Sequence, residues 1–124
     1  MNDSPVYKLW VGGRPRPKAR PRKGKHGNFY TPKQTKEWEA LVAWKWREQH
    51  GADVPFKNGP VSLKAVFYYA DRRAPDTDNL VKLICDSLNG IAWNDDRQVV
   101  EIYARKILGA EVEGVDLEIR PCDS

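Results

Sequence analysis

Three aspartates and a lysine are close together in the middle of the chain. In the stretch APDTDNLVKLICDSLNG, Asp76 and Asp78 are separated by one residue, and Lys82 and Asp86 follow Asp78 at intervals of four. Carboxylate oxygens without histidine or thiolate partners suit Mg²⁺, Mn²⁺ or Ca²⁺ and do not suit zinc. The residue types therefore predict a site for a hard divalent cation.

A second acidic pair, Asp95 and Asp96, follows soon afterwards in the sequence WNDDRQVV. Mg²⁺ takes one or two protein carboxylates and completes its coordination with waters and phosphate oxygens. A lysine beside such an ion can steady the negative charge that develops on a phosphate. Lys82 is one helical turn from Asp78, so these residues predict metal-dependent chemistry on a phosphodiester.

A purely structural interpretation of the same residues is also open. Asp76 and Asp78 fall at the expected start of a helix, where carboxylates cap the helix and favour its dipole. Asp78, Lys82 and Asp86 can form two i,i+4 pairs, each worth only a few tenths of a kcal/mol, about 0.2–0.5. Under this interpretation the acidic stripe is a solvated helix face.

The acidic stripe needs a helix beneath it, and the sequence predicts one from Thr77 to Leu88, closed by Asn89-Gly90. On this helix Leu80, Ile84 and Leu88 fall opposite the Asp78/Lys82/Asp86/Asn89 stripe. The apolar face can therefore be buried while the charged face stays accessible.

The remaining elements follow from turn and capping signals. Thr31, Pro32 and Gln34 form a capping-box sequence at the start of a longer helix, which is predicted to run to about His50 and to stop at Gly51. Its buried side is predicted to carry Trp38, Leu41, Val42 and Trp46. Strands are predicted over a segment that ends at Gly12-Gly13 and over residues 61–69, 97–108 and 115–121, the last two forming a hairpin.

The length of 124 residues fits one domain, residues 1–124, with one hydrophobic core. The element order of strand, helix, strand, helix, strand, strand predicts an α+β fold with a mixed β-sheet and two main helices packed against it.

Positive charge is concentrated near the N-terminus. Residues 1–36 contain ten Lys or Arg and one acid, a net charge of +9, whereas residues 37–124 contain eleven and sixteen, a net charge of −5. Prolines and glycines exclude a helix over residues 14–29, which are predicted to form a mobile basic loop. A basic segment of this kind favours DNA backbone binding over a merely solubilising tail. Its cations are Arg14, Arg16, Lys18, Arg20, Arg22, Lys23 and Lys25.

Two aromatic residues, Phe29 and Tyr30, end this basic segment. They could stack on bases or fix the start of the following helix, and the second role is favoured. The sequence has no apolar run long enough for a membrane span and no signal peptide, so we expect a cytoplasmic protein without membrane contact. Cys85 and Cys122 are expected to be reduced thiols.

The acidic motif resembles the RusA-type Holliday junction resolvases, which are small bacterial and phage endodeoxyribonucleases. The resemblance is carried by PDTDNLVKLICDSLNG, WNDDRQVV and the downstream Lys106, and it extends to GRPRPKARPR and FYTPKQT near the N-terminus. It thus covers most of the chain, from about Gly13 to Lys106.

The resemblance assigns roles residue by residue. It implies that Asp76, Asp78 and Asp96 bind Mg²⁺, which Mn²⁺ can replace, with Asp95 beside them, and that Lys82 is catalytic. We expect Asn79 to orient the carboxylates and Asp86 to pair with Lys82. The family further implies a homodimer that cuts a four-way DNA junction with paired symmetric nicks.

Two alternatives to this function stay open at the level of the sequence. The chain could be a phage or bacterial regulator that binds nucleic acid without catalysis and keeps the acidic face only as structure. It could also be a nuclease of the same fold that acts on flaps or forks. Neither the longer arginine-proline segment nor Trp93-Asn94, which depart from some relatives, changes a predicted metal ligand.

Overall fold

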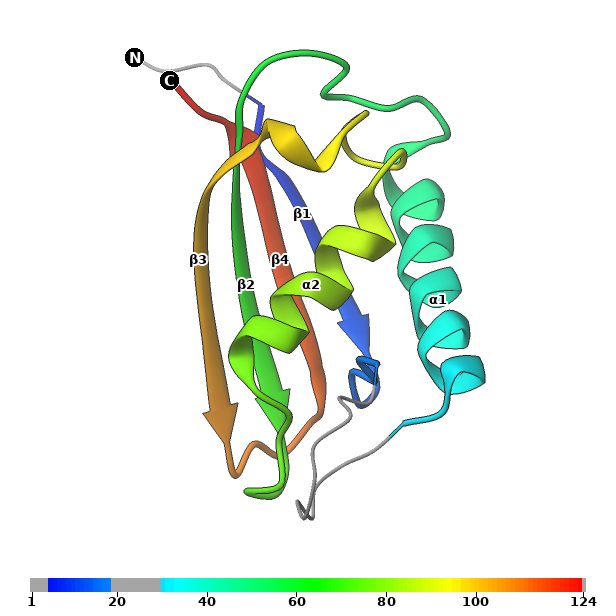
Figure 1. Ribbon diagram of the computed structural model, residues 1–124, viewed down its shortest axis with the longest axis vertical. Helices are drawn as coiled ribbons and strands as arrows, with labels where there is room; N and C mark the ends of the chain where they lie inside the picture. The colour runs from blue at the N-terminus through cyan, green and yellow to red at the C-terminus, as the bar shows by residue number, and fades with distance from the viewer. Residues whose placement is uncertain (1–4, 19–29, 124) are drawn as a thin grey trace.

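The computed structural model describes residues 5–18 and 30–123. Its elements are β1 (Tyr7–Gly12), α1 (Pro32–His50), β2 (Val61–Tyr69), α2 (Thr77–Leu88), the 3₁₀-helix η1 (Asp96–Gln98), β3 (Val99–Leu108) and β4 (Gly114–Pro121). Both predicted helices and all four strands are confirmed. The fold is a small α+β domain with one mixed sheet and two helices, as predicted (Figure 1).

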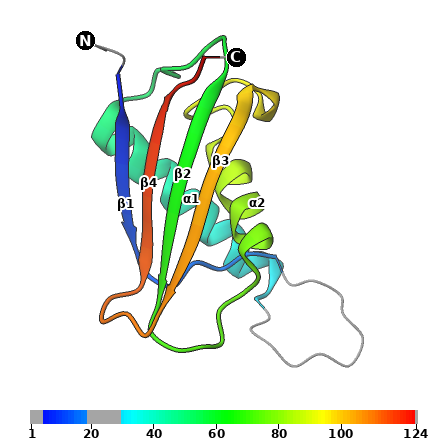
Figure 2. The ribbon, with the colours of Figure 1, turned by 90° about the vertical axis from the view of Figure 1, so that its left-hand side faces the viewer.

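The strands lie in the order β1-β4-β2-β3. β4 is antiparallel to both β1 and β2, whereas β2 and β3 are parallel. Parallel neighbours need a crossover connection, and α2 supplies it. Both helices cover the same face of the sheet, and the opposite face is open in Figure 2.

The predicted hairpin between the last two strands is wrong. β2 lies between β3 and β4, so the connection 109–113 passes across the end of β2. Ala110 N donates a hydrogen bond to Tyr69 O at 3.0 Å, which fixes that crossing. β4 pairs with β1 and β2 instead, because its apolar residues complete the centre of the sheet.

The core lies between the sheet and the two helices. α1 contributes Trp38, Val42 and Trp46, as predicted, while Leu41 is only partly buried against them. From α2 the buried residues include Leu80, Ile84 and Leu88. The opposite stripe of α2 is therefore kept at the surface by the burial of this apolar face.

The signals that predicted the start of α1 act as expected. The Thr31 side chain accepts a hydrogen bond from Gln34 N, and the Gln34 side chain accepts one from Thr31 N. Pro32 occupies the first turn, and Gly51 ends the helix with a φ of 89°. Within the described ranges 5–18 and 30–123, no helix is long and apolar enough to cross a membrane.

Candidate active site

The first two aspartates of the motif lie at the start of α2, beside the ends of β2 and β3 (Figure 1). Asp76 is the N-cap residue, although its side chain makes no capping hydrogen bond, and Asp78 lies in the first turn. Asp78 Oδ1 accepts a hydrogen bond from Asn79 N at 2.9 Å. Both aspartates are exposed. Two carboxylates are thus presented one residue apart at an accessible helix end.

Lys106 comes to the same place from β3. Its Nζ donates a hydrogen bond to Pro75 O at 2.8 Å, immediately before Asp76. The hydrogen bond connects β3 to the loop that precedes α2. Sequence reasoning gave Lys106 no role beyond its part in the motif, although its place downstream of the acidic pair was noted.

Lys82 and Asp86 continue the exposed stripe toward the other end of α2. Lys82 Nζ lies 3.4 Å from Asp86 Oδ2, and the Lys82 side chain is 67% exposed. The expected i,i+4 pairing of these two residues is confirmed. At this exposure the ion pair adds little stability, about 0.3–0.5 kcal/mol, so Lys82 can leave it at small cost.

Asn79 makes a contact that its expected role did not include. Its Nδ2 donates a hydrogen bond to Lys18 O at 2.9 Å, and its orientation of the carboxylates stays a prediction. The described end of the basic segment is thereby held against the start of α2. Asn79 thus connects the acidic motif to the basic segment.

Residues 14–18 are packed, although the prediction placed them in a mobile loop. Pro15 and Pro17 are buried, and the buried Tyr69 hydroxyl donates a hydrogen bond to Pro15 O at 2.9 Å. The first part of the basic segment, residues 14–18, therefore belongs to the packed domain. Arg20, Arg22, Lys23, Lys25 and Phe29 lie outside the described residues, so their predicted DNA contacts stay predictions.

Arg14 holds this packed segment in place. Its guanidinium contacts Glu113 at 2.7 Å, the Tyr30 hydroxyl at 2.7 Å and Asp71 at 3.4 Å, and it lies over the Tyr69 ring. Burial opposes its charge, but the hydrogen bond to Tyr30 and the two carboxylates raise the pKa of Arg14. The charge of Arg14 is thus paired with carboxylates of the domain itself. By contrast, the Lys18 side chain is exposed to solvent and the Arg16 side chain is partly exposed. The Tyr30 hydroxyl likewise has a partner inside the domain, whereas the predicted role of Phe29 and Tyr30 at the start of α1 stays a prediction.

The two residues of the second acidic pair, Asp95 and Asp96, make different contacts at η1. Asp95 Oδ1 accepts from Arg97 N at 2.8 Å, and its Oδ2 lies 3.2 Å from the Arg97 guanidinium. These hydrogen bonds lower the pKa of the Asp95 carboxyl. Asp96 Oδ1 instead accepts from Trp93 Nε1 at 2.8 Å. Because Trp93 is fully buried, this contact fixes the Asp96 carboxylate to the core.

Asp96 lies near the far end of α2, close to Cys85. Burial, together with the nearby charges of Asp96 and Asp86, raises the pKa of the Cys85 thiol to about 11. Cys85 follows Asp76 by nine residues, about 14 Å along a helix. A magnesium ion binds its oxygens at about 2.1 Å, so one ion cannot contact both ends of α2.

The structure therefore brings together Asp76 with Asp78, and Lys82 with Asp86, but it does not bring Asp96 to the first pair. Within residues 5–18 and 30–123, no three His, Cys, Asp or Glu side chains are grouped closely enough to hold a metal ion. The sequence could not predict this separation, because it depends on the direction in which β3 returns along the sheet.

Trp93 is the second residue whose importance sequence reasoning missed. The sequence pattern predicts no role for Trp93, yet its indole Nε1 donates a hydrogen bond that orients Asp96. Its position three residues before Asp96 is the signal that could have indicated this contact.

Comparison with known proteins gives one family. A family model described as Endodeoxyribonuclease RusA matches residues 12–120. A search of curated proteins found no match. The matched region includes both acidic pairs, Lys82 and Lys106, so it contains the whole site described above. Because the match covers most of the chain, this protein belongs to the Endodeoxyribonuclease RusA family.

Proposed function

We propose that this protein is a Mg²⁺-dependent endodeoxyribonuclease that resolves four-way DNA junctions as a homodimer. The observation that carries the proposal is the exposed pair Asp76 and Asp78 at the start of α2, with Lys82 one turn further along the same face. A solvated helix face accounts for the charges but not for their place at the end of the packed basic segment.

The residues at this helix end fit a magnesium ion by their chemistry. Asp76 and Asp78 offer only carboxylate oxygens, and Mg²⁺ needs no more than one or two protein carboxylates when phosphate oxygens complete its coordination. When bound, the ion activates water and polarises the phosphodiester. Asp76 and Asp78 would hold it, and Lys82 would reach the same phosphate after it leaves Asp86.

A second copy of the chain supplies a way to bring Asp96 to this pair. β3 is an edge strand of the described sheet, and it pairs only with β2. Four of its apolar side chains are largely exposed. They are Val100, Ile102, Tyr103 and Leu108. An exposed apolar edge of this length invites pairing with another strand.

Antiparallel pairing of two β3 strands about a two-fold axis places the beginning of one strand beside the end of the other. Asp96 shortly precedes the beginning of β3, and Lys106 near its end contacts Pro75, next to Asp76. In such a dimer Asp96 of the partner subunit would approach Asp76 and Asp78. Two composite sites would result, which suits two symmetric nicks.

The proposal is tested by incubating the purified protein with a labelled four-way junction, a flap and a plain duplex of the same sequences. We expect paired nicks in the junction with Mg²⁺ or Mn²⁺, no cutting in chelator, and weaker cutting of the other substrates. Equal cutting of duplex and junction would refute the junction specificity. No cutting of any substrate with metal would favour a binding protein without catalysis.

A further inference from the structure

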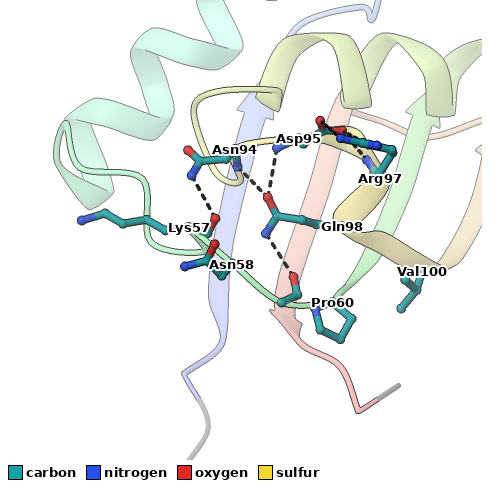
Figure 3. A pocket seen from close by; sticks show the side chains of 9 residues that line it. Lys57, Asn58, Pro60, Asn94, Asp95, Arg97, Gln98 and Val100 are labelled. Atoms are coloured by element: carbon teal, nitrogen blue, oxygen red, sulfur yellow. Dashed lines mark hydrogen bonds and ion pairs between the residues drawn. The ribbon is translucent and has the colours of Figure 1, made fainter.

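A shallow depression beside Asp96 is not used by the site proposed above. It has a volume of about 630 Å³ and lies between the loop 57–60 and the segment 94–98, which leads into β3 (Figure 3). Its rim carries Lys57, Asn58 and Arg97. Asp96 stands between Asp95 and Arg97 in the sequence, and both of these neighbours line the depression, so the depression lies close to Asp96.

Gln98 fixes the floor of the depression, because both the oxygen and the nitrogen of its carboxamide are hydrogen-bonded to the backbone. Gln98 Oε1 accepts from Asn94 N at 2.9 Å and from Asp95 N at 3.0 Å. Its Nε2 donates to Phe56 O at 2.9 Å and to Gly59 O at 3.0 Å. The two segments are thus clamped together across the floor.

A further hydrogen bond extends the clamp, from Asn94 Nδ2 to Lys57 O at 2.9 Å. The carboxamide of Gln98 and the amide nitrogen of the Asn94 side chain therefore already have partners within the protein. They leave the rim side chains, and not the floor, to meet a ligand.

The rim offers donors and positive charge. The Lys57 and Asn58 side chains have no hydrogen-bond or ion-pair partner among the residues that the structure describes. The Arg97 side chain is 90% exposed, and Asp95 holds its guanidinium on one side. Asp95 offsets the charge of Arg97, so Lys57 remains as the surplus cation. Lysine, arginine and amide groups at an open rim are the donors that proteins use to contact DNA phosphates.

We propose that this depression binds a DNA backbone phosphate close to the cleavage site, with Lys57 and Arg97 as its cationic ligands and Asn58 as a neutral donor. The inference rests on the proposed nuclease function, since it takes Asp96 as a residue that approaches DNA. It adds a DNA contact between the loop 57–60 and the segment 94–98, at residues that are not part of the basic segment 14–29.

The test is equilibrium binding of a fluorescent four-way junction by Lys57→Ala, Arg97→Ala and the double variant, in Ca²⁺ and over a range of KCl concentrations. Each lost phosphate contact is expected to reduce the slope of log K against log salt by about 0.9, so the double variant, which loses the one phosphate of each depression, should lose about 0.9 per subunit. A matched control removes Lys45 and Arg120, which contact Glu48 and Glu118 away from the depression. The Lys45→Ala/Arg120→Ala control should keep the wild-type slope.

The phosphate site is overturned if the Lys57/Arg97 double variant keeps the wild-type slope, or if the control loses as much. A charge-reversal variant, Lys57→Glu, should weaken binding further than Lys57→Ala, and equal binding by the two would also count against the site. Cleavage by the wild-type protein is measured separately. A reduced slope with no cleavage by wild type would support this site and reject the nuclease, whereas cleavage with an unchanged slope would do the reverse.

Discussion

The carboxylate of Asp78 has a local structural role and a proposed chemical one, and an isosteric substitution separates them. Asn at this position can still accept the hydrogen bond from Asn79 N, so the helix start should be preserved. The substitution removes the negative charge that a metal ion needs. The same distinction applies to Asp76 and Asp96.

We therefore predict that Asp78→Asn folds and binds a four-way junction like wild type but cuts it about 100- to 1,000-fold more slowly, because a lost metal ligand forfeits several kcal/mol of barrier lowering. Asp116→Asn, on the exposed side of β4, is the control and should cut normally. Single-turnover cleavage in Mg²⁺ and a gel shift in Ca²⁺ measure the two properties. Cutting by Asp78→Asn within a few-fold of wild type would exclude it as a metal ligand.

Cys85 provides a test of the electrostatics beside Asp96. Its pKa of about 11 lies above the ordinary value of 9.0, so at pH 8 we expect roughly 100-fold less thiolate than an unperturbed thiol has. Between pH 9 and 11 the unfolded chain loses this proton while the folded chain keeps it. The contribution of Cys85 to stability is therefore present below pH 9 and falls as the pH rises toward 11.

Reaction with a thiol reagent at pH 8 measures this effect. Cys85 in a Cys122→Ser variant should react much more slowly than the same residue after denaturation. Cys122 in a Cys85→Ser variant provides the comparison, because Cys122 follows β4 and its thiol contacts Glu101 and Asp123 at the exposed surface of the domain. Fast reaction of Cys85 in the folded protein would show that the thiol is not buried as described.

At the scale of the elements, the pairing of β1 with β4 requires a glycine at position 114, because there is no space for a side chain. A Cβ atom at Gly114 would lie 2.6 Å from both Val11 O and the Trp10 ring. Val11 O belongs to the backbone of the paired strand, so it cannot move away without disturbing the sheet. Gly12, directly opposite in the register, has only an ordinary contact at 3.5 Å.

Gly114→Ala is accordingly expected to lower the free energy of unfolding by about 1–3 kcal/mol, the usual cost of overpacking. This corresponds to a decrease in Tm of roughly 4 °C per kcal/mol for a domain of this size. The Tm of each variant is measured by thermal unfolding followed by circular dichroism. Gly12→Ala should change Tm little, and equal losses in the two variants would contradict the steric explanation.

How far the sequence predicts this structure can be judged element by element. The bounds of α2 and β2 follow from local signals, namely apolar periodicity and the turn residues that flank it, and so does the accessible Asp78/Lys82/Asp86 stripe. The hairpin prediction failed because strand adjacency depends on distant partners: the 109–113 segment has turn residues, but β2 already occupies the place beside β3.

The site was predictable to the same extent. Residue types and helix spacing identified Asp76, Asp78 and Lys82 as one surface. The distance of Asp96 from them is a property of the whole crossover, in which α2 runs away from its starting point and η1 lies at the other end. No local pattern contains that information.

At the scale of the whole molecule, the separation of Asp96 from Asp78 makes a prediction about mixed dimers. If each site combines Asp76 and Asp78 of one subunit with Asp96 of the other, a dimer of one Asp78→Asn chain and one Asp96→Asn chain has both substitutions in one site. Its second site is intact. Co-expression of the two differently tagged variants should therefore restore single nicks but not paired nicks.

The matched control is a mixed dimer of Asp76→Asn and Asp78→Asn, which damages both sites and should stay inactive. Nicking is measured on a labelled junction after purification through both tags. Absence of activity in the Asp78→Asn/Asp96→Asn mixture, with both chains folded and dimeric, would refute the composite site.

The place of β4 in the sheet also has a consequence for how the protein folds during synthesis. Within the described sheet, β1 pairs only with β4, and Tyr7 lies opposite Ile119. Contacts between these two strands therefore join residues that are very far apart in the sequence. Pairings of such high sequence separation form slowly, because the entropy of loop closure must be overcome first. While the ribosome still holds β4, β1 and β2 expose the edges that β4 will later join. The nascent domain therefore cannot complete its sheet until the β4 residues emerge from the ribosome, and this domain is expected to fold only after all of its own strands have been synthesised.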